Sequence, residues 1–157
     1  KFIADLLEYA ETHDDIEFHF TTTHLEEVGL DYQYFPAKES KNIFIDKYTS
    51  PQQLFGVLSS VDVFVTSMLH LGLTGLCNGT PFISYRGPGK AQSFLRSIDG
   101  DWAIVDDNIS FQEMRDRFFT QTKAQLVSQY NMERLDEMKK GSAQNYEFCK
   151  KIVETYA

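Results

Sequence analysis

The fold of the chain is indicated by residues 61–85, which read VDVFVTSMLHLGLTGLCNGTPFISY. Residues 61–66 are rich in β-branched side chains and predict a buried strand. Residues 69–78 have the apolar spacing of a helix, and Gly79 follows at the position where helices commonly end with a positive φ. Residues 81–85 predict the next strand. Because a helix separates the two strands, we expect them to be parallel and to belong to one sheet.

Strand and helix patterns alternate on both sides of this stretch. The predicted strands cover residues 16–20, 33–35, 42–45 and 102–105, and the predicted helices cover residues 2–12, 91–98 and everything from residue 110 onward, with a short helix or loop at residues 24–30. A further helix start is marked by Ser50 as N-cap and Pro51 at the first helical position. The alternation predicts the α/β class, with a doubly wound, mainly parallel, Rossmann-like sheet in which residues 61–66 are central.

The whole chain, residues 1–157, is expected to form one α/β domain. Its helical C-terminal tail is expected to pack over the sheet or onto a neighbouring domain. The first predicted helix, at residues 2–12, has no strand before it, although a doubly wound sheet begins with one. We therefore expect the chain to be part of a longer protein, with the first strand of this domain missing.

The composition argues against several kinds of partner. The formal net charge is −8 and the sequence pI is about 4.9, so the surface repels nucleic-acid phosphates and anionic lipid headgroups. The longest uncharged stretch, residues 63–84 apart from His70, contains Thr, Ser, Asn and Gly and is typical of a protein core. We therefore expect no nucleic-acid partner and no transmembrane segment.

Cysteine and histidine spacing indicates neither a metal nor another cofactor. Cys77 and Cys149 share no metal-ligand spacing with each other or with a histidine, and both are expected to be buried free thiols in a reducing compartment. His19 and His24 lie five residues apart, which matches no recognised zinc spacing. The chain also contains no GxGxxG, Walker A or GxSxG motif, which argues against ATPase and serine-hydrolase functions.

Positive charge is concentrated in one part of the chain. Residues 63–98 contain no Asp or Glu and carry a charge of +3, whereas the remainder carries −11. Two predicted strand-to-helix junctions lie in this stretch, at residues 66–70 and 85–90. Helix N-termini present free N–H groups, so both junctions are suited to phosphate or carboxylate groups. The alternative is that acidic residues are scarce here only because much of the stretch is buried core.

His70 is the most suggestive single residue, because it lies in the first turn of a helix directly after a predicted strand. A neutral imidazole there can donate one hydrogen bond to a bound anion or act as an acid–base group. The alternative is that His70 is only a packing residue.

Several residues between 62 and 95 follow a recognisable order. Leu-His begins the predicted helix, Gly-x-Pro follows it, Tyr ends the next strand, and Lys and a Phe-Leu pair come after. These residues are Leu69, His70, Gly79, Pro81, Tyr85, Lys90, Phe94 and Leu95. In this run the chain resembles the polysaccharide pyruvyl transferase family. The resemblance implies a two-domain fold like that of GT-B glycosyltransferases, of which this chain is the C-terminal half.

The resemblance also implies a reaction. Members transfer a pyruvate ketal from phosphoenolpyruvate to a sugar during bacterial surface-glycan biosynthesis in the cytoplasm. The acceptor would be a glycan or a lipid-linked sugar, bound in a cleft that the missing N-terminal domain completes. The chain departs from the family at Met68, where members usually have an arginine that contacts the phosphoenolpyruvate anion. Arg86, beside the second junction, is expected to supply that charge instead.

Two other functions agree with the same pattern. The Gly-x-Pro after a central helix also resembles the half of GT-B glycosyltransferases that binds a nucleotide sugar. Those proteins usually carry a carboxylate on that helix to hold the ribose, and residues 69–78 have none. The third possibility is a non-catalytic domain that retains the fold.

In the pyruvyl transferase interpretation, the catalytic residue is His70, which would protonate or orient the enol group. The residues expected to bind the anionic substrate are Ser67, Met68, Leu69, Tyr85, Arg86, Gly87, Gly89 and Lys90. The isolated chain is expected to show no turnover but to retain weak anion affinity.

Overall fold

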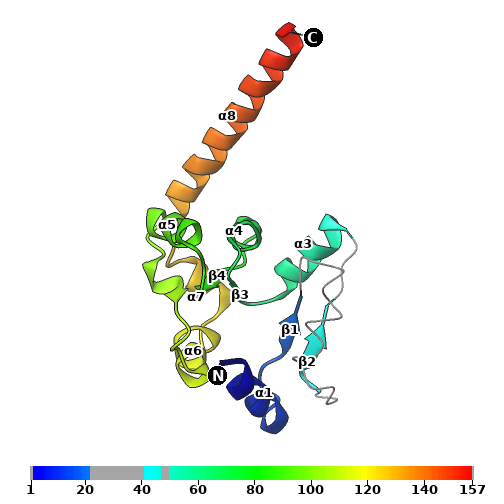
Figure 1. Ribbon diagram of the computed structural model, residues 1–157, viewed down its shortest axis with the longest axis vertical. Coiled ribbons are helices and arrows are strands. Elements are labelled where there is room, and N and C mark those ends of the chain that lie inside the picture. The colour runs from blue at the N-terminus through cyan, green and yellow to red at the C-terminus, as the bar shows by residue number, and fades with distance from the viewer. Residues whose placement is uncertain (1, 22–40, 47–49, 157) are drawn as a thin grey trace.

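The structure is a computed structural model that describes residues 2–21, 41–46 and 50–156 (Figure 1). The predictions for residues 24–30 and 33–35 lie outside the described residues. The first half contains α1 (Phe2–Thr12), β1 (Phe18–Phe20), β2 (Ile43–Ile45), α3 (Pro51–Ser60), β3 (Phe64–Thr66) and α4 (Leu69–Cys77). The second half contains β4 (Phe82–Tyr85), α5 (Gly89–Ser97), a 3₁₀ turn (Asp101–Ala103), β5 (Ile104–Val105), α6 (Phe111–Met114), a π-helical segment (Arg115–Phe119), α7 (Lys123–Val127) and α8 (Met132–Tyr156). Helices alternate with strands as predicted.

The strands form parallel sheets, which confirms the α/β class. Among the described residues, β1 pairs with β2, and β3, β4 and β5 form a second sheet in that order. The register of the second sheet sets Thr66 opposite Ser84, and Tyr85 opposite Val105. The expectation that residues 61–66 are central in one sheet is therefore wrong for the described chain. β3 pairs only with β4, and β4 is the central strand.

Local sequence explains where the helices next to the junctions begin and end. The Ser50 hydroxyl accepts a hydrogen bond from the backbone N–H of Gln53 at 3.3 Å, so α3 begins at the predicted cap. Gly79 has φ 79° and follows α4, as expected. α5 begins at Gly89, two residues earlier than predicted, after Pro88 in an extended conformation.

Aromatic side chains from several elements meet in the core among a larger number of aliphatic ones. Phe111, at the start of α6, lies between rings of other elements, with centroid distances of 6.3 Å to Phe2 and 5.9 Å to Phe18. Tyr130 is buried and its hydroxyl donates to the backbone carbonyl of Phe82 at 2.6 Å. Burial raises the pKa of Tyr130, so the phenol stays protonated. This bond fixes the segment before α8 against the central strand.

A polar cluster joins α1 to the segment after α6. The Tyr9 hydroxyl donates to Asp15 Oδ1 at 2.7 Å, and Arg115 Nη2 lies 3.3 Å from Asp15 Oδ2. The guanidinium of Arg115 also lies over the Tyr9 ring, 5.4 Å from its centroid. The hydrogen bond from Tyr9 and the neighbouring Arg115 hold the pKa of Asp15 below its usual value. The cluster therefore depends on an ionised carboxylate.

The C-terminal helix differs from expectation. Figure 1 shows α8 extending away from the rest of the molecule. Leu135, in its first turn, is buried, but Met138, Tyr146 and Phe148 are exposed. The prediction that the tail packs over the sheet is therefore wrong beyond the first turn of α8.

Two further expectations can be compared with the structure. Cys77 is exposed and not buried, because it lies in the last turn of α4 beyond the residues of that helix that face the core. In the part of the chain that the structure describes, no helix is long and apolar enough to cross a membrane.

Candidate functional site

The two predicted junctions lie at the same edge of the three-stranded sheet. β3 and β4 are parallel neighbours with Thr66 opposite Ser84, so their carboxyl ends point the same way. The turn from β3 to α4 and the turn from β4 to α5 are therefore adjacent. Ligands of parallel α/β sheets bind at this kind of edge.

The β3–α4 turn is shaped by Thr66. Its Oγ1 accepts a hydrogen bond from the backbone N–H of Met68 at 3.0 Å, which bends the chain into the helix. Met68 is the N-cap residue of α4, and no side chain caps the helix. The first-turn N–H groups, including that of His70, are therefore available to an anion.

His70 itself is exposed at this helix start. Its side chain has no hydrogen-bond or ion-pair partner in the described part of the chain. The imidazole is thus free to contact a ligand above the sheet edge.

The β4–α5 turn has an unusual backbone. Arg86 has φ 52°, in the left-handed region, and its N–H donates to the carbonyl of Val105 at 3.1 Å. The Arg86 side chain is exposed, and its Nε lies 3.3 Å from Asp107 Oδ2. Such a surface ion pair contributes at most about 1 kcal/mol, so the guanidinium can exchange Asp107 for another anion at small cost.

Gly87 is required by close contact within this turn. A Cβ added there would lie 2.0 Å from Ser84 Oγ and 3.3 Å from Ala91 Cβ. Ser84 is fully buried, and its hydroxyl has no hydrogen-bond partner among the residues that the structure describes. The carbonyl of Gly87 accepts a hydrogen bond from Gln92 Nε2 at 3.1 Å, which ties the turn to α5.

The remaining predicted site residues divide by exposure. Ser67, Met68, Gly89 and Lys90 are exposed, Leu69 and Tyr85 are half-buried, and Gly87 is buried. The ring of Tyr85 packs against Phe2 of α1, with centroids 5.2 Å apart. The structure therefore places His70, Arg86 and Lys90 at one edge without pairing them with each other.

Asp106 and Asp107, which follow β5 at the same edge, were missed by the sequence analysis. Asp107 pairs with Arg86, and Asp106 Oδ1 accepts from the backbone N–H of Asn108 at 2.8 Å. The signal for them was a third strand end, after residues 102–105. Asp106 and Asp107 therefore mark the limit of the positively charged region on the side of β5.

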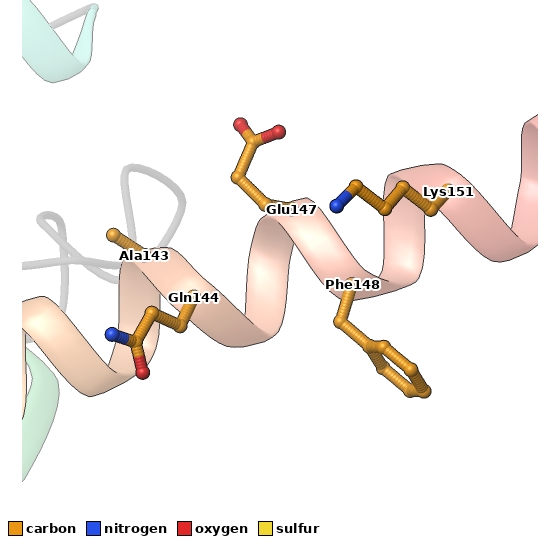
Figure 2. Close-up of a pocket in the computed structure, with 5 residues that line it drawn as sticks. All are labelled: Ala143, Gln144, Glu147, Phe148 and Lys151. Carbon is orange, nitrogen blue, oxygen red and sulfur yellow. The ribbon is translucent and has the colours of Figure 1, made fainter.

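A shallow concavity on α8 does not form part of the site. Figure 2 shows its residues, which all come from one helix, so no second element faces them. They are Ala143, Gln144, Glu147, Phe148 and Lys151. Because α8 extends away from the sheet, this surface is remote from the two turns (Figure 1).

A family model described as polysaccharide pyruvyl transferase matches residues 2–86. The chain belongs to the polysaccharide pyruvyl transferase family. Membership implies a transferase that uses a sugar as acceptor. The match includes the whole β3–α4 turn with His70, and it ends at Arg86, before Gly87 and Lys90. No curated protein and no solved structure matches the chain.

Proposed function

We propose that the two turns bind phosphoenolpyruvate and that the protein transfers its pyruvyl group to a sugar as a ketal. The observation that carries the proposal is the parallel pairing of Thr66 with Ser84, which sets two uncapped helix starts side by side. One start carries an exposed histidine and the other carries Arg86 and Lys90. Together they offer an acid–base group and positive charge to one anionic substrate.

The reaction needs both kinds of group. Two sugar hydroxyls bond to C2 of the enolpyruvyl group, phosphate leaves, and the C3 methylene takes a proton to become a methyl group. One hydroxyl proton balances the new C–H bond and the other leaves with phosphate. His70 is the group that carries a proton or orients the enol. Arg86, Lys90 and the first N–H groups of α5 hold the phosphate or carboxylate.

Met68 leaves the proposed site without a positive charge at the start of α4. Methionine cannot form a bidentate pair with a carboxylate, so the charge that family members usually have at this position must come from elsewhere. Arg86 is the nearest arginine in sequence and follows the adjacent strand, and in the described part of the chain it pairs with one exposed carboxylate, that of Asp107. Phosphoenolpyruvate binding should therefore depend on Arg86.

A titration followed by NMR tests the proposal. Adding phosphoenolpyruvate to the chain should shift the amide signals of residues 67–72 and 86–92. The affinity should be in the millimolar range, because much of the free energy of a few charge-assisted hydrogen bonds is offset by the translational freedom that the ligand loses. Lys90→Ala should weaken binding several-fold, whereas Lys140→Ala, on exposed α8, removes the same charge and should not. Shifts spread over α8, or none at the two turns, would contradict the proposal.

The donor is tested separately with the full-length protein. Calorimetric titration with phosphoenolpyruvate and with a panel of nucleotide sugars should give binding only to the former. α4 carries no carboxylate to hold a ribose, which favours this outcome. Binding only to nucleotide sugars would replace pyruvyl transfer by glycosyl transfer.

The acceptor is expected to enter from a second domain. We propose that this chain forms the C-terminal half of a two-domain enzyme that acts in the cytoplasm on a glycan or lipid-linked sugar. The isolated chain should then bind phosphoenolpyruvate without turning it over.

A further inference from the structure

Two hydroxyl-bearing residues lie next to each other at the carboxyl edge of the three-stranded sheet. Thr66 and Ser84 are register partners in the parallel strands β3 and β4, so their side chains lie on the same face. The Thr66 Oγ1 accepts a hydrogen bond from the backbone N–H of Met68 at 3.0 Å. Ser84 Oγ is fully buried and has no hydrogen-bond partner in the described part of the chain. The Thr66 hydroxyl therefore shapes the turn that follows it, whereas the Ser84 hydroxyl makes no such bond.

The Ser84 hydroxyl lies against the β4–α5 turn. A Cβ built on Gly87 would lie 2.0 Å from Ser84 Oγ, so the backbone of Gly87 directly covers the hydroxyl. The peptide unit that joins Arg86 to Gly87 is attached at this point. Neither the carbonyl of Arg86 nor the N–H of Gly87 makes a hydrogen bond with the residues that the structure describes. Two unpaired backbone groups and one unpaired hydroxyl thus lie together just before α5.

The missing bond of Ser84 contrasts with a second buried hydroxyl close by in the chain. Thr80, two residues before β4, is as deeply buried as Ser84, but its Oγ1 donates to the carbonyl of Leu58 at 2.6 Å. Buried polar groups normally have such partners, and a buried hydroxyl without one destabilises the folded state. The left-handed backbone of Arg86 adds a second cost in the same turn. The turn is therefore unfavourable in the free protein, at the place where the anion is proposed to bind.

The geometry of a peptide unit links the hydroxyl to the proposed ligand. In a trans peptide the C=O and N–H groups point in opposite directions. The Ser84 hydroxyl lies on the buried side of the turn, whereas Arg86 and Lys90 are exposed. If the carbonyl of Arg86 accepts a hydrogen bond from Ser84, the N–H of Gly87 must point toward the exposed side. It then joins the free N–H groups at the start of α5, which an anion can bind.

We propose that Ser84 is a positioning residue for the anionic substrate. When the anion binds, the Ser84 hydroxyl donates to the carbonyl of Arg86 and so holds the N–H of Gly87 toward the anion, which accepts a hydrogen bond from it. This inference rests on the proposed function, because phosphoenolpyruvate is the anion that brings the turn into this state. The Ser84 hydroxyl is then paired only in the bound protein, so it strengthens binding although it destabilises the free protein.

The inference predicts opposite effects of one substitution on stability and on binding. Ser84→Ala removes an unpaired buried hydroxyl and should raise the urea midpoint of the free chain. The same substitution should weaken phosphoenolpyruvate binding about five-fold, the effect of losing one hydrogen bond in the bound state. A side chain that only packs would instead lower both stability and affinity, or leave the affinity unchanged.

An NMR titration with phosphoenolpyruvate at constant ionic strength measures both the affinity and the response of the turn. In the wild-type chain the amide proton signal of Gly87 should move downfield, because that N–H donates to the anion. In Ser84→Ala this shift should be smaller even at saturation. Thr80→Ala is the matched control, since it removes an equally buried hydroxyl that does make a hydrogen bond. It should lower the urea midpoint and leave both the affinity and the Gly87 shift unchanged.

The outcomes separate this inference from the proposed function. If the wild-type chain binds phosphoenolpyruvate and Ser84→Ala has the same affinity and the same Gly87 shift, the role of Ser84 is overturned and the proposed function stands. Weaker binding together with a lower urea midpoint would also overturn it, since Ser84 would then act only in packing. If the wild-type chain shows no response at the two turns, the proposed function fails and this inference fails with it.

Discussion

Replacing Gly87 by alanine is expected to destabilise the fold by about 1–3 kcal/mol, the usual cost of forcing an extra methyl group into a packed site. The new Cβ would lie 2.0 Å from Ser84 Oγ, well inside van der Waals contact, and 3.3 Å from Ala91 Cβ. Ser84 is fully buried, so its hydroxyl cannot move into solvent to make room. The cost should therefore arise mainly from one oxygen atom.

A double-mutant cycle isolates that atom. Ser84→Ala alone should stabilise the protein by about 1 kcal/mol, because it removes a buried hydroxyl that has no partner. In the Ser84→Ala background, Gly87→Ala should cost about 1 kcal/mol or less, since the nearest remaining atoms lie at 3.3 and 3.4 Å. The two changes should therefore couple by about 1–2 kcal/mol.

Urea unfolding followed by the fluorescence of Trp102, the single tryptophan, provides the free energies. Gly89→Ala is the matched control in the same turn, because a Cβ there meets nothing within 4 Å. It should change stability by less than about 0.5 kcal/mol. Additive effects of Ser84→Ala and Gly87→Ala would refute the contact as the reason for glycine.

Three further predictions follow from contacts outside the site. Gly72→Ala would set a Cβ 2.4 Å from the buried ring of Phe82 and should cost about 1–3 kcal/mol in the same urea assay; an unchanged midpoint would contradict it. Tyr9 and a neighbouring arginine lower the pKa of Asp15 in the folded protein. The ionised carboxylate therefore contributes stability above the ordinary pKa of an aspartate, and this contribution is lost as the pH falls through the lowered pKa. Asp15→Asn should reduce the loss of stability between about pH 5 and 2. Tyr130→Phe leaves the carbonyl of Phe82 without its 2.6 Å partner and should cost about 1–3 kcal/mol at neutral pH. Because burial raises the pKa of Tyr130, that contribution should fall only above about pH 10, and a midpoint insensitive to this substitution would argue against the bond.

Local patterns predicted the elements well where the signal was itself local. The apolar spacing of residues 2–12 and the Ser50 cap correspond to α1 and the start of α3 as the structure has them. Both are determined by side chains within one or two helical turns. The start of α5 was misplaced because Gly89 was treated as part of a loop, whereas the helix begins at Gly89, directly after the extended N-cap residue Pro88.

Pairing between distant strands was harder to predict. Residues 61–66 have the composition of a central strand, but composition does not say which neighbours are present, and β3 has one among the strands that the structure describes. The contact of Arg86 with Asp107 depends on the register of β4 and β5, which places Tyr85 opposite Val105. The sequence of either strand alone does not predict this register.

The candidate site was predictable in part. The uneven charge and the strand-to-helix junctions located His70 and Arg86 at one edge, since parallel strands end together. The exposure of Cys77 was not foreseen, because an apolar helix pattern does not distinguish its last turn from its buried middle. The Ser84 hydroxyl, which lacks a hydrogen-bond partner among the described residues, could not be foreseen either, because the partners of a buried side chain depend on tertiary contacts.

At Arg86 the requirements of folding and of the proposed anion binding differ, because the left-handed backbone favours glycine whereas the proposed site needs the arginine side chain. A non-glycine residue at φ 52° raises the energy of the native state by roughly 1–2 kcal/mol, and glycine would relieve it. A redesign guided by stability alone would replace Arg86 by glycine and so remove the guanidinium at this turn. In the proposed site this guanidinium binds the anion, so a relative that does not bind the anion would be free to carry glycine here. The residue at this position should then distinguish relatives that bind the anion from relatives that do not.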